Sequence, residues 1–247
     1  MSGSASASNS DPTASRADPA PGSGVDAAAG LDAAFFVRWL AAVDTAVARE
    51  ADRLTELDAA IGDADHGSNL RRGFAAVTAA LDADPPATPG AVLALAGRQL
   101  ISTVGGASGP LYGTLLRRTG KELGDARQVS AVRLGVALRA GVAAVAQLGG
   151  AAPGDKTMLD ALGPGADALG AGDADDATAS APAGAGGGDA ELFAVASAAA
   201  EEGARATVEL RARKGRASYL GERSVGHLDP GAASSVLLFA ALAEVAR

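Results

Sequence analysis

Apolar residues recur at helical spacing from the first apolar segment of this 247-residue chain onward. Phe36, Leu40, Val43, Val47 and Leu54 follow one another at steps of four, three, four and seven residues, so they share one face of a helix. Similar patterns mark the segments 68–82, 88–103, 108–120, 127–148, 156–168, 190–213 and 232–246. No stretch shows the alternation with period two that is typical of a half-buried strand. The periodicity therefore predicts eight amphipathic helices.

The composition favours the same fold class. Hydrophobic residues make up 48% of the chain but aromatic residues only 3%, so the core must consist mainly of Ala, Leu and Val. Such small side chains favour helices that approach one another closely over thick aromatic sheets. We therefore expect an all-α fold.

Two segments are poor in large apolar residues. Residues 1–30 are rich in Ser, Ala, Pro, Gly and Asp and are predicted to form a disordered tail, and residues 163–189 are predicted to form a flexible loop rich in Gly and Ala. Only two predicted helices follow that loop, too few to bury a second core. Residues 31–247 are therefore predicted to form one helical domain.

Charge and composition exclude several classes of function. The net charge is −8 and no Lys/Arg stripe is present, which disfavours nucleic acid as a partner. The absence of cysteine excludes disulfides, thiolate zinc sites and a catalytic thiol. No segment reaches the about 18 to 20 uninterrupted apolar residues of a membrane span. We expect a cytoplasmic protein.

The stretch "GDADHGSN" at 62–69 and the residues just before it concentrate three carboxylates, those of Asp58, Asp63 and Asp65. Carboxylates at this spacing repel one another unless a cation lies between them, and hard divalent cations prefer oxygen ligands. The alternative is a solvated loop in which Asp65 or Ser68 caps the following helix. An EF-hand is excluded because the sixth and twelfth loop positions counted from Asp63 are not Gly and Glu.

Residues 66–69 open a predicted helix, and free backbone N–H groups at such an end favour an anion. A phosphate beside a metal ion is what a nucleotide provides. Taken alone, His66 and His227 are more typical of caps or structural side chains than of ligands.

Two glycine-rich loops offer further anion sites. The loop "STVGGASGPLYG" at 102–113 contains Gly105 and Gly106, whose amides can form a phosphate-binding nest, although a glycine-rich interhelical turn is the more common explanation of any one such loop. The loop "GGAAPGDKTMLDAL" at 149–162 is not a Walker A motif, because Asp155 precedes Lys156 and no strand leads into it. Lys156 remains a candidate phosphate contact.

A basic loop, "RKGRASYLGERSVGHLDPG" at 213–231, stands out in an acidic chain. Arg213, Lys214, Arg216 and Arg223 gather there, before an Asp-Pro-Gly turn. Taken by itself, the loop is interpreted as a solvated basic surface loop. Beside a metal–phosphate site, Arg216 would neutralise charge as phosphoryl transfer requires.

Together, "GDADHGSN", "GGASGPLYGT", "GDKTMLDAL" and "GRASYLGERSVGHLDPGAAS" resemble the ordered signature of the ADP-binding L subunit of dihydroxyacetone kinase, over residues 31–247. The resemblance implies a barrel of eight antiparallel amphipathic helices with ADP or ATP bound in the loops at one end. It implies that Asp58, Asp63 and Asp65 hold two Mg²⁺ ions and that Arg216 and His66 are catalytic. The nucleotide-binding positions that it implies are His66, Gly67, Ser68, Asn69, Gly106, Ala107, Ser108, Gly154, Arg216, Asp229, Pro230 and Gly231.

One position departs from the family pattern. The family usually has Gly between the second and third acids, where this chain has Ala64. If that position requires a positive φ, alanine costs about 1 kcal/mol there.

The resemblance also implies partners. A separate K subunit would hold dihydroxyacetone covalently on a histidine, and a phosphohistidine carrier of the phosphotransferase system would rephosphorylate bound ADP in place. Three alternatives stay open: a fatty-acid kinase domain, whose usual "DGDTGTN" motif differs from this one; an ATP-exchanging subunit of a related ketose or polyol kinase; and a nucleotide-binding regulator that docks on a transcription factor.

Overall fold

The computed structural model describes residues 30–171 and 188–247. The predicted tail, apart from Gly30, and residues 172–187 of the predicted flexible loop lie outside the described residues.

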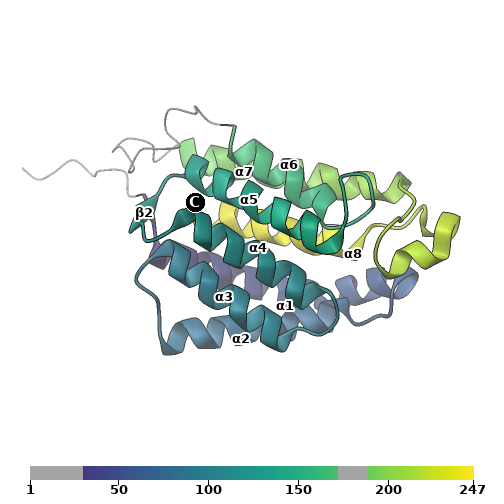
Figure 1. The fold of residues 1–247 in the computed structure, drawn as a ribbon, viewed down its shortest axis with the longest axis horizontal. Coiled ribbons are helices and arrows are strands. Elements are labelled where there is room, and N and C mark those ends of the chain that lie inside the picture. The colour runs from purple at the N-terminus through teal and green to yellow at the C-terminus, as the bar shows by residue number, and fades with distance from the viewer. Residues whose placement is uncertain (1–29, 172–187) are drawn as a thin grey trace, which may run out of the picture.

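Eight α-helices in the described residues form a closed ring (Figure 1). Each helix packs on the next in the chain, and the last packs back on the first. The predicted all-α class is therefore confirmed. The helices are α1 (Ala33–Ile61), α2 (His66–Ala83), α3 (Pro89–Thr103), α4 (Ser108–Leu123), α5 (Ala131–Gly149), α6 (Leu159–Leu169), α7 (Gly188–Ala206) and α8 (Pro230–Val245).

The periodic apolar face of α1 lies in the core as expected. Phe36, Leu40, Val43 and Leu54 are all fully buried. Trp39 is buried with them, and its indole N–H donates to the carbonyl of Leu238 at 2.8 Å, which ties α1 to α8 and closes the ring.

One small sheet lies at the left-hand end of the ring in Figure 1. Strand β1 (Leu31–Asp32) pairs antiparallel with β2 (Gln128–Val129). Strands of two residues are too short to produce a periodic pattern, which explains why the sequence showed none.

The predictions of a helix over 156–168 and of a loop over 163–189 overlap, and the structure supports the helix there, because α6 continues through Pro164 to Leu169. Proline has no N–H to donate to the carbonyl of Asp160 four residues earlier. That carbonyl faces α7, where a Cβ on Gly203 would lie only 2.0 Å from it. Close packing against α7 therefore accommodates the proline inside the helix.

The helix predicted over 190–213 is too long. It ends at Ala206, where a short 3₁₀ helix, η2 (Thr207–Glu209), follows. The Thr207 hydroxyl donates to the carbonyl of Ala204 at 2.6 Å. The Thr207 carbonyl accepts from Lys156 and also from the backbone N–H of Leu210 at 3.1 Å, three residues later, as in a 3₁₀ helix. A second 3₁₀ helix, η3 (Arg216–Ser224), occupies the predicted basic loop.

Helix α5 alone among the described helices is long and apolar enough to cross a membrane by length and composition, with a mean hydropathy of 1.4. It packs between α4 and α6 in the ring, with 44% of the apolar window buried, as a core helix does.

Glycines allow α3 and α4 to meet backbone to backbone. A Cβ on Gly113 would lie 2.6 Å from the carbonyl oxygen of Gly97, and a Cβ on Gly120 would lie 2.5 Å from that of Gly90. Neither neighbour can retreat because both are helix backbone, so a side chain at these positions would force the helices apart.

The connection between α1 and α2 carries local strain at Ala64, whose φ is +61°. The positive φ that the family's usual glycine suggested is therefore present, and alanine adopts it at a cost.

We expect Gly113→Ala to lower the free energy of unfolding by about 1–3 kcal/mol, because the added methyl overpacks the contact between α3 and α4. The matched control is Gly163→Ala in α6, where a Cβ would meet nothing within 4 Å. That change should raise stability by up to about 1 kcal/mol through helix propensity. Urea unfolding of both variants measures the difference, and equal effects would contradict the contact.

We expect Ala64→Gly to raise the free energy of unfolding by about 1 kcal/mol, because glycine adopts a positive φ without a Cβ clash. The control is Ala59→Gly, an exposed position inside α1, which should lose up to about 1 kcal/mol. A loss of stability in both variants would show that Ala64 is not strained.

Candidate functional site

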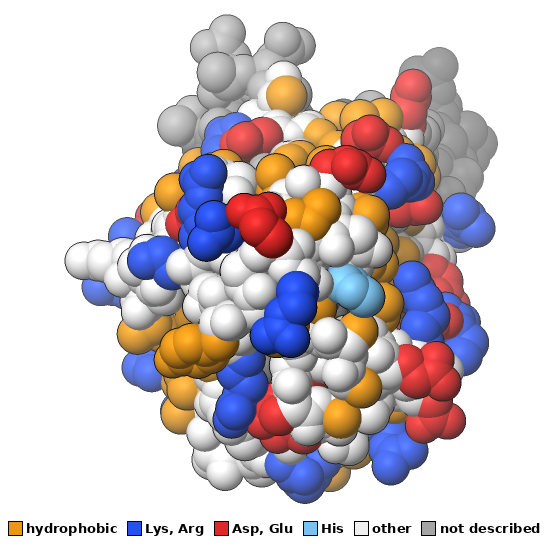
Figure 2. Space-filling model, turned by 90° about the vertical axis from the view of Figure 1, so that its right-hand side faces the viewer, with side chains coloured by type: hydrophobic (Ala, Val, Ile, Leu, Met, Phe, Trp, Pro, Cys, Tyr) orange, Lys and Arg blue, Asp and Glu red, His pale blue; other side chains and the backbone are white. Residues whose placement is uncertain are grey.

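Four connections converge at one end of the ring. Because successive helices run in opposite directions, the α1–α2, α3–α4 and α5–α6 connections and the segment before α8 all reach the end at which η3 lies (Figure 1). They enclose a cavity of about 580 Å³, within the range that holds small-molecule ligands. Figure 2 views the molecule from this end, where basic and acidic side chains lie close together.

The three carboxylates of the acidic stretch meet at the cavity wall. One oxygen from each of Asp58, Asp63 and Asp65 lies within 4.8 Å of the others. This all-oxygen donor set fits a hard divalent cation such as Mg²⁺. Arg216 also reaches this cluster, and its guanidinium contacts the Asp63 carboxylate at 2.9 Å.

Asp58 also shapes the acidic loop. It lies in the last turn of α1, and its Oδ2 accepts the backbone N–H groups of Asp65 at 3.0 Å and His66 at 3.3 Å. Gly62 leaves room for it, because a Cβ there would lie 2.0 Å from Asp58 Oδ1. The carboxylate that presents one potential ligand atom to a metal therefore also folds the loop that carries the other two.

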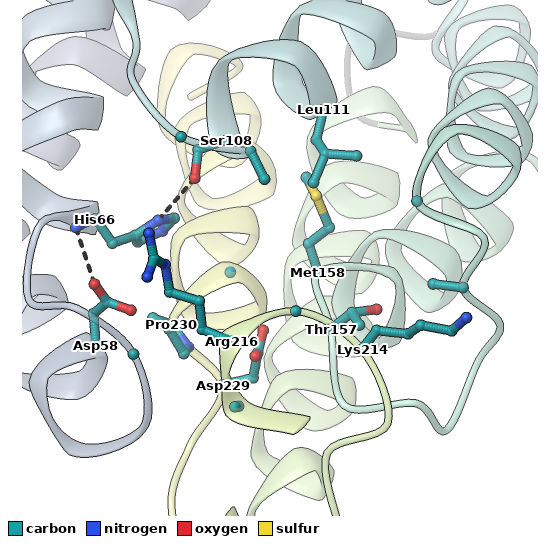
Figure 3. Close-up of a pocket in the computed structure, with 18 of the residues that line it drawn as sticks. Asp58, His66, Ser108, Leu111, Thr157, Met158, Lys214, Arg216, Asp229 and Pro230 are labelled. Atoms are coloured by element: carbon teal, nitrogen blue, oxygen red, sulfur yellow. Dashed lines mark hydrogen bonds between the residues drawn. The ribbon is translucent and has the colours of Figure 1, made fainter. Parts of the chain in front are cut away.

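His66 lies buried at the centre of a hydrogen-bond network. Its Nδ1 pairs with the Ser108 hydroxyl at 3.1 Å, drawn in Figure 3, and its Nε2 pairs with the Ser234 hydroxyl at 2.8 Å. Burial lowers the pKa of His66 below its ordinary value, although the nearby carboxylates of Asp58 and Asp65 oppose the shift. A neutral imidazole therefore links α2 to the starts of α4 and α8.

Tyr112 extends this network. Its hydroxyl lies 2.7 Å from the Ser234 hydroxyl and 2.9 Å from that of Ser235, and burial raises its pKa to about 12. The tyrosine therefore stays neutral and holds α4 against the first turn of α8.

The start of α4 offers backbone amides to the cavity. Gly105, Gly106, Ala107 and Ser108 line it, and Gly106 has a φ of +66°. A helix N-terminus preceded by such a turn presents free N–H groups and the positive end of the helix dipole, which together favour an anion.

Apolar side chains line another part of the cavity. Leu111, Val145, Leu148 and Met158 come from α4, α5 and the loop before α6. Figure 3 shows Leu111 and Met158 close together. This apolar wall suits a flat, weakly polar group such as a nucleobase.

The remaining wall belongs to the start of α8. Asp229, Pro230 and Gly231 line the cavity, and Asp229 caps the helix by accepting the backbone N–H of Ala232 at 2.7 Å. Burial raises the pKa of Asp229 to about 7.

The structure brings most of the sequence-predicted site residues to this one cavity. The residues that line it are Asp58, Asp63, Asp65, His66, Gly106, Ala107, Ser108, Arg216, Asp229, Pro230 and Gly231. Four others, Gly67, Ser68, Asn69 and Gly154, are not among the lining residues.

Those four shape the surroundings of the cavity. Gly67 packs on α1, because a Cβ there would lie 1.9 Å from the carbonyl oxygen of Ala51. The Asn69 side chain accepts from Arg72 at 2.7 Å, and Ser68 donates to the carbonyl of Asp65. Gly154 donates its N–H to Asp160 at 2.5 Å.

Several lining residues escaped the sequence analysis as ligand contacts, among them Tyr112, Met158 and Thr157. All three lie inside the quoted motifs, but apolar and hydroxyl side chains near helix starts are as typical of core packing as of ligand contacts. Only the position of these residues in the fold distinguishes a ligand contact from a core residue.

Comparison with known proteins shows the family of this chain. Residues 60–244 match the DAK2 domain. The chain is 40% identical over 212 residues to the PEP-dependent dihydroxyacetone kinase, ADP-binding subunit DhaL, of Escherichia coli, covering 86% of this chain and 96% of that protein. It is 39% identical to the corresponding subunit of kinase 1 of Listeria innocua, covering 85% of this chain and 96% of that subunit.

A solved structure shares the fold. The dihydroxyacetone kinase of C. freundii matches with a TM-score of 0.64 at 26% identity, over 93% of this chain. This chain spans 38% of the length of that kinase. By domain match, by identity over nearly the full length of its relatives and by fold, the chain belongs to the DAK2 domain family of dihydroxyacetone kinase ADP-binding subunits.

Proposed function

We propose that this chain is the nucleotide-binding half of a dihydroxyacetone kinase, which presents a magnesium nucleotide to dihydroxyacetone held on a separate K subunit. The observation that carries the proposal is the cavity in which three clustered carboxylates and the N-terminus of α4 meet. The identity to ADP-binding subunits over 96% of their length supports it.

The cavity suggests how a nucleotide lies. Its phosphates would contact the amides of Gly106 to Ser108 on one side and, through Mg²⁺, the carboxylates of Asp58, Asp63 and Asp65 on the other. The base would then lie against the apolar wall at Leu111 and Met158. Asp229 to Gly231 would contact the sugar or base from the start of α8.

Phosphoryl transfer needs charge neutralisation around the transferred group. Two bound Mg²⁺ ions would supply Lewis-acid stabilisation of the phosphate oxygens. Arg216 is the residue of this chain placed to add to it, because its guanidinium already reaches the acidic cluster from a largely exposed position on the rim. His66 suits an orienting role better than proton transfer, since both ring nitrogens pair with serine hydroxyls.

The names of two relatives support one source of the phosphoryl group. The subunits of Escherichia coli and Listeria innocua are named as subunits of PEP-dependent kinases. We therefore propose that ADP remains bound in this cavity and is rephosphorylated in place by a phosphohistidine carrier of the phosphotransferase system in the cytoplasm. Exchange with free ATP is the alternative.

One experiment tests the proposal and separates these donors. The protein is purified, its retained nucleotide is extracted and identified, and phosphorylated carrier, K subunit and dihydroxyacetone are then added. ADP that stays bound and cycles to ATP while dihydroxyacetone phosphate accumulates supports the in-place mechanism. Loss of the nucleotide on gel filtration, with activity restored by free ATP, supports exchange. No nucleotide binding in the presence of Mg²⁺ would overturn the proposed function.

We expect Asp63→Ala to weaken Mg²⁺-dependent ADP binding by about 100-fold or more, because it removes one of three potential ligands. Titration calorimetry with and without Mg²⁺ measures the effect. The control is Asp84→Ala, an exposed carboxylate at the end of α2, which should bind as the unaltered protein does. Unchanged binding in Asp63→Ala would remove this residue from the metal site.

We expect Arg216→Ala to lower the rate of phosphoryl transfer by about 1,000-fold, with a much smaller effect on ADP affinity, because its charge counts most in the transition state. Arg223→Ala, beyond the kink at Gly221 of the same segment, is the matched control and should keep its rate. Single-turnover transfer to dihydroxyacetone on the K subunit provides the measurement. Equal rates in the two variants would contradict the role of Arg216.

A further inference from the structure

Lys156 is buried although it carries a charge. Its side chain is only 1% exposed, and its backbone has a φ of +62°, a conformation that non-glycine residues rarely adopt. It lies in the connection between α5 and α6 and, like Thr157 and Met158 after it, lines the cavity. The proposed function above gives it no role.

The ammonium group of Lys156 joins three segments. It donates to the carbonyl of Thr207 in η2 at 2.6 Å and to the carbonyl of His227 in the segment before α8. The Thr207 hydroxyl in turn accepts the backbone N–H of Asp229 at 3.0 Å. Lys156 therefore connects the wall that carries Met158 with the wall that carries Asp229.

Lys156 and Asp229 also interact through their charges. Asp229 is only 8% exposed, and burial raises its pKa to about 7, while the charge of Lys156 opposes that rise and the charge of Asp160 adds to it. The charges of Asp229 and Glu209 both raise the pKa of Lys156. The charge of Asp229 in turn raises the pKa of Tyr112. Burial also lowers the pKa of Lys156.

We propose that Lys156 is a positioning residue of the nucleotide site, which holds the Met158 wall against the start of α8 through the carbonyls of Thr207 and His227. Its charge also acts on Asp229, which begins that wall. An ionised Asp229 accepts hydrogen bonds from hydroxyl or amino groups of the nucleotide, whereas a protonated one accepts fewer. The effect on nucleotide binding rests on the proposed function. The link between Lys156 and Asp229 rests on the structure alone, whatever ligand the cavity binds.

Lys156→Met tests the inference, since methionine fills similar space without a charge or donors. Lys121→Met at the far end of α4 is the matched control. Unfolding by urea without nucleotide, and ADP binding with Mg²⁺, are both measured from pH 5 to pH 9.

The sign of the pH dependence follows from Asp229. Its folded-state pKa of about 7 lies above the ordinary value of 3.8, so its contribution lowers stability as pH rises toward 7 and levels off above. Without the Lys156 charge, this fall should continue above pH 7. ADP affinity at pH 7 should drop by about 10- to 100-fold and partly recover at higher pH.

Asp229→Asn keeps a good capping side chain but cannot ionise. It should remove this component of the pH dependence, and in the double variant it should restore part of the stability that Lys156→Met loses. If Lys156→Met fails to fold, Asp229→Asn is compared with the unaltered protein instead. An identical pH dependence of unfolding in these two proteins would overturn the inference.

A Lys156→Met protein whose pH profile runs parallel to that of Lys121→Met, with ADP affinity within twofold, would also overturn the inference. If the unaltered protein binds no ADP, the proposed function fails, while the unfolding measurements still report on the coupling between Lys156 and Asp229.

Discussion

The alternating direction of the helices is the constraint on which the site depends. In a closed antiparallel ring, every second connection returns to the same end, so the acidic loop after α1, the turn before α4, the loop before α6 and the start of α8 meet there. Small residues make the ring tight enough for this, since Gly97 and Gly113 allow the backbones of α3 and α4 to touch. A looser packing would move the start of α4, and with it the amides of Ala107 and Ser108, away from the acidic cluster.

Polar groups then hold the converging loops in register. Asp58 holds its own loop by accepting the N–H groups of Asp65 and His66. The His66 ring then pairs with Ser108 and Ser234, which fixes this loop relative to α4 and α8. On the opposite side Lys156 joins η2 to the segment before α8. Buried groups of this kind are costly unless paired, so the same bonds that satisfy them also fix the shape of the cavity.

The sequence predicted the number and type of helices because their apolar period is local information. It made the helix before α8 too long, because the end of α7 depends on a distant contact. Helix α7 ends at Ala206, and the Thr207 carbonyl that follows accepts from Lys156, 51 residues earlier in the chain. The motifs located most of the lining residues, yet Gly67 and Gly154 support the cavity from outside, since a motif does not say which of its residues face a ligand.

The sequence by itself determined an all-helical chain, an acidic stretch suited to a hard cation, and glycine-rich turns at helix starts, because each of these depends on residues close together in the chain. Only the tertiary structure decided that the three carboxylates line one cavity together with the start of α4, that both nitrogens of His66 are paired, and that the buried Lys156 is linked to Asp229 through Thr207. Those relations join residues up to 168 positions apart, as His66 and Ser234 are, and they exist only once the ring has closed.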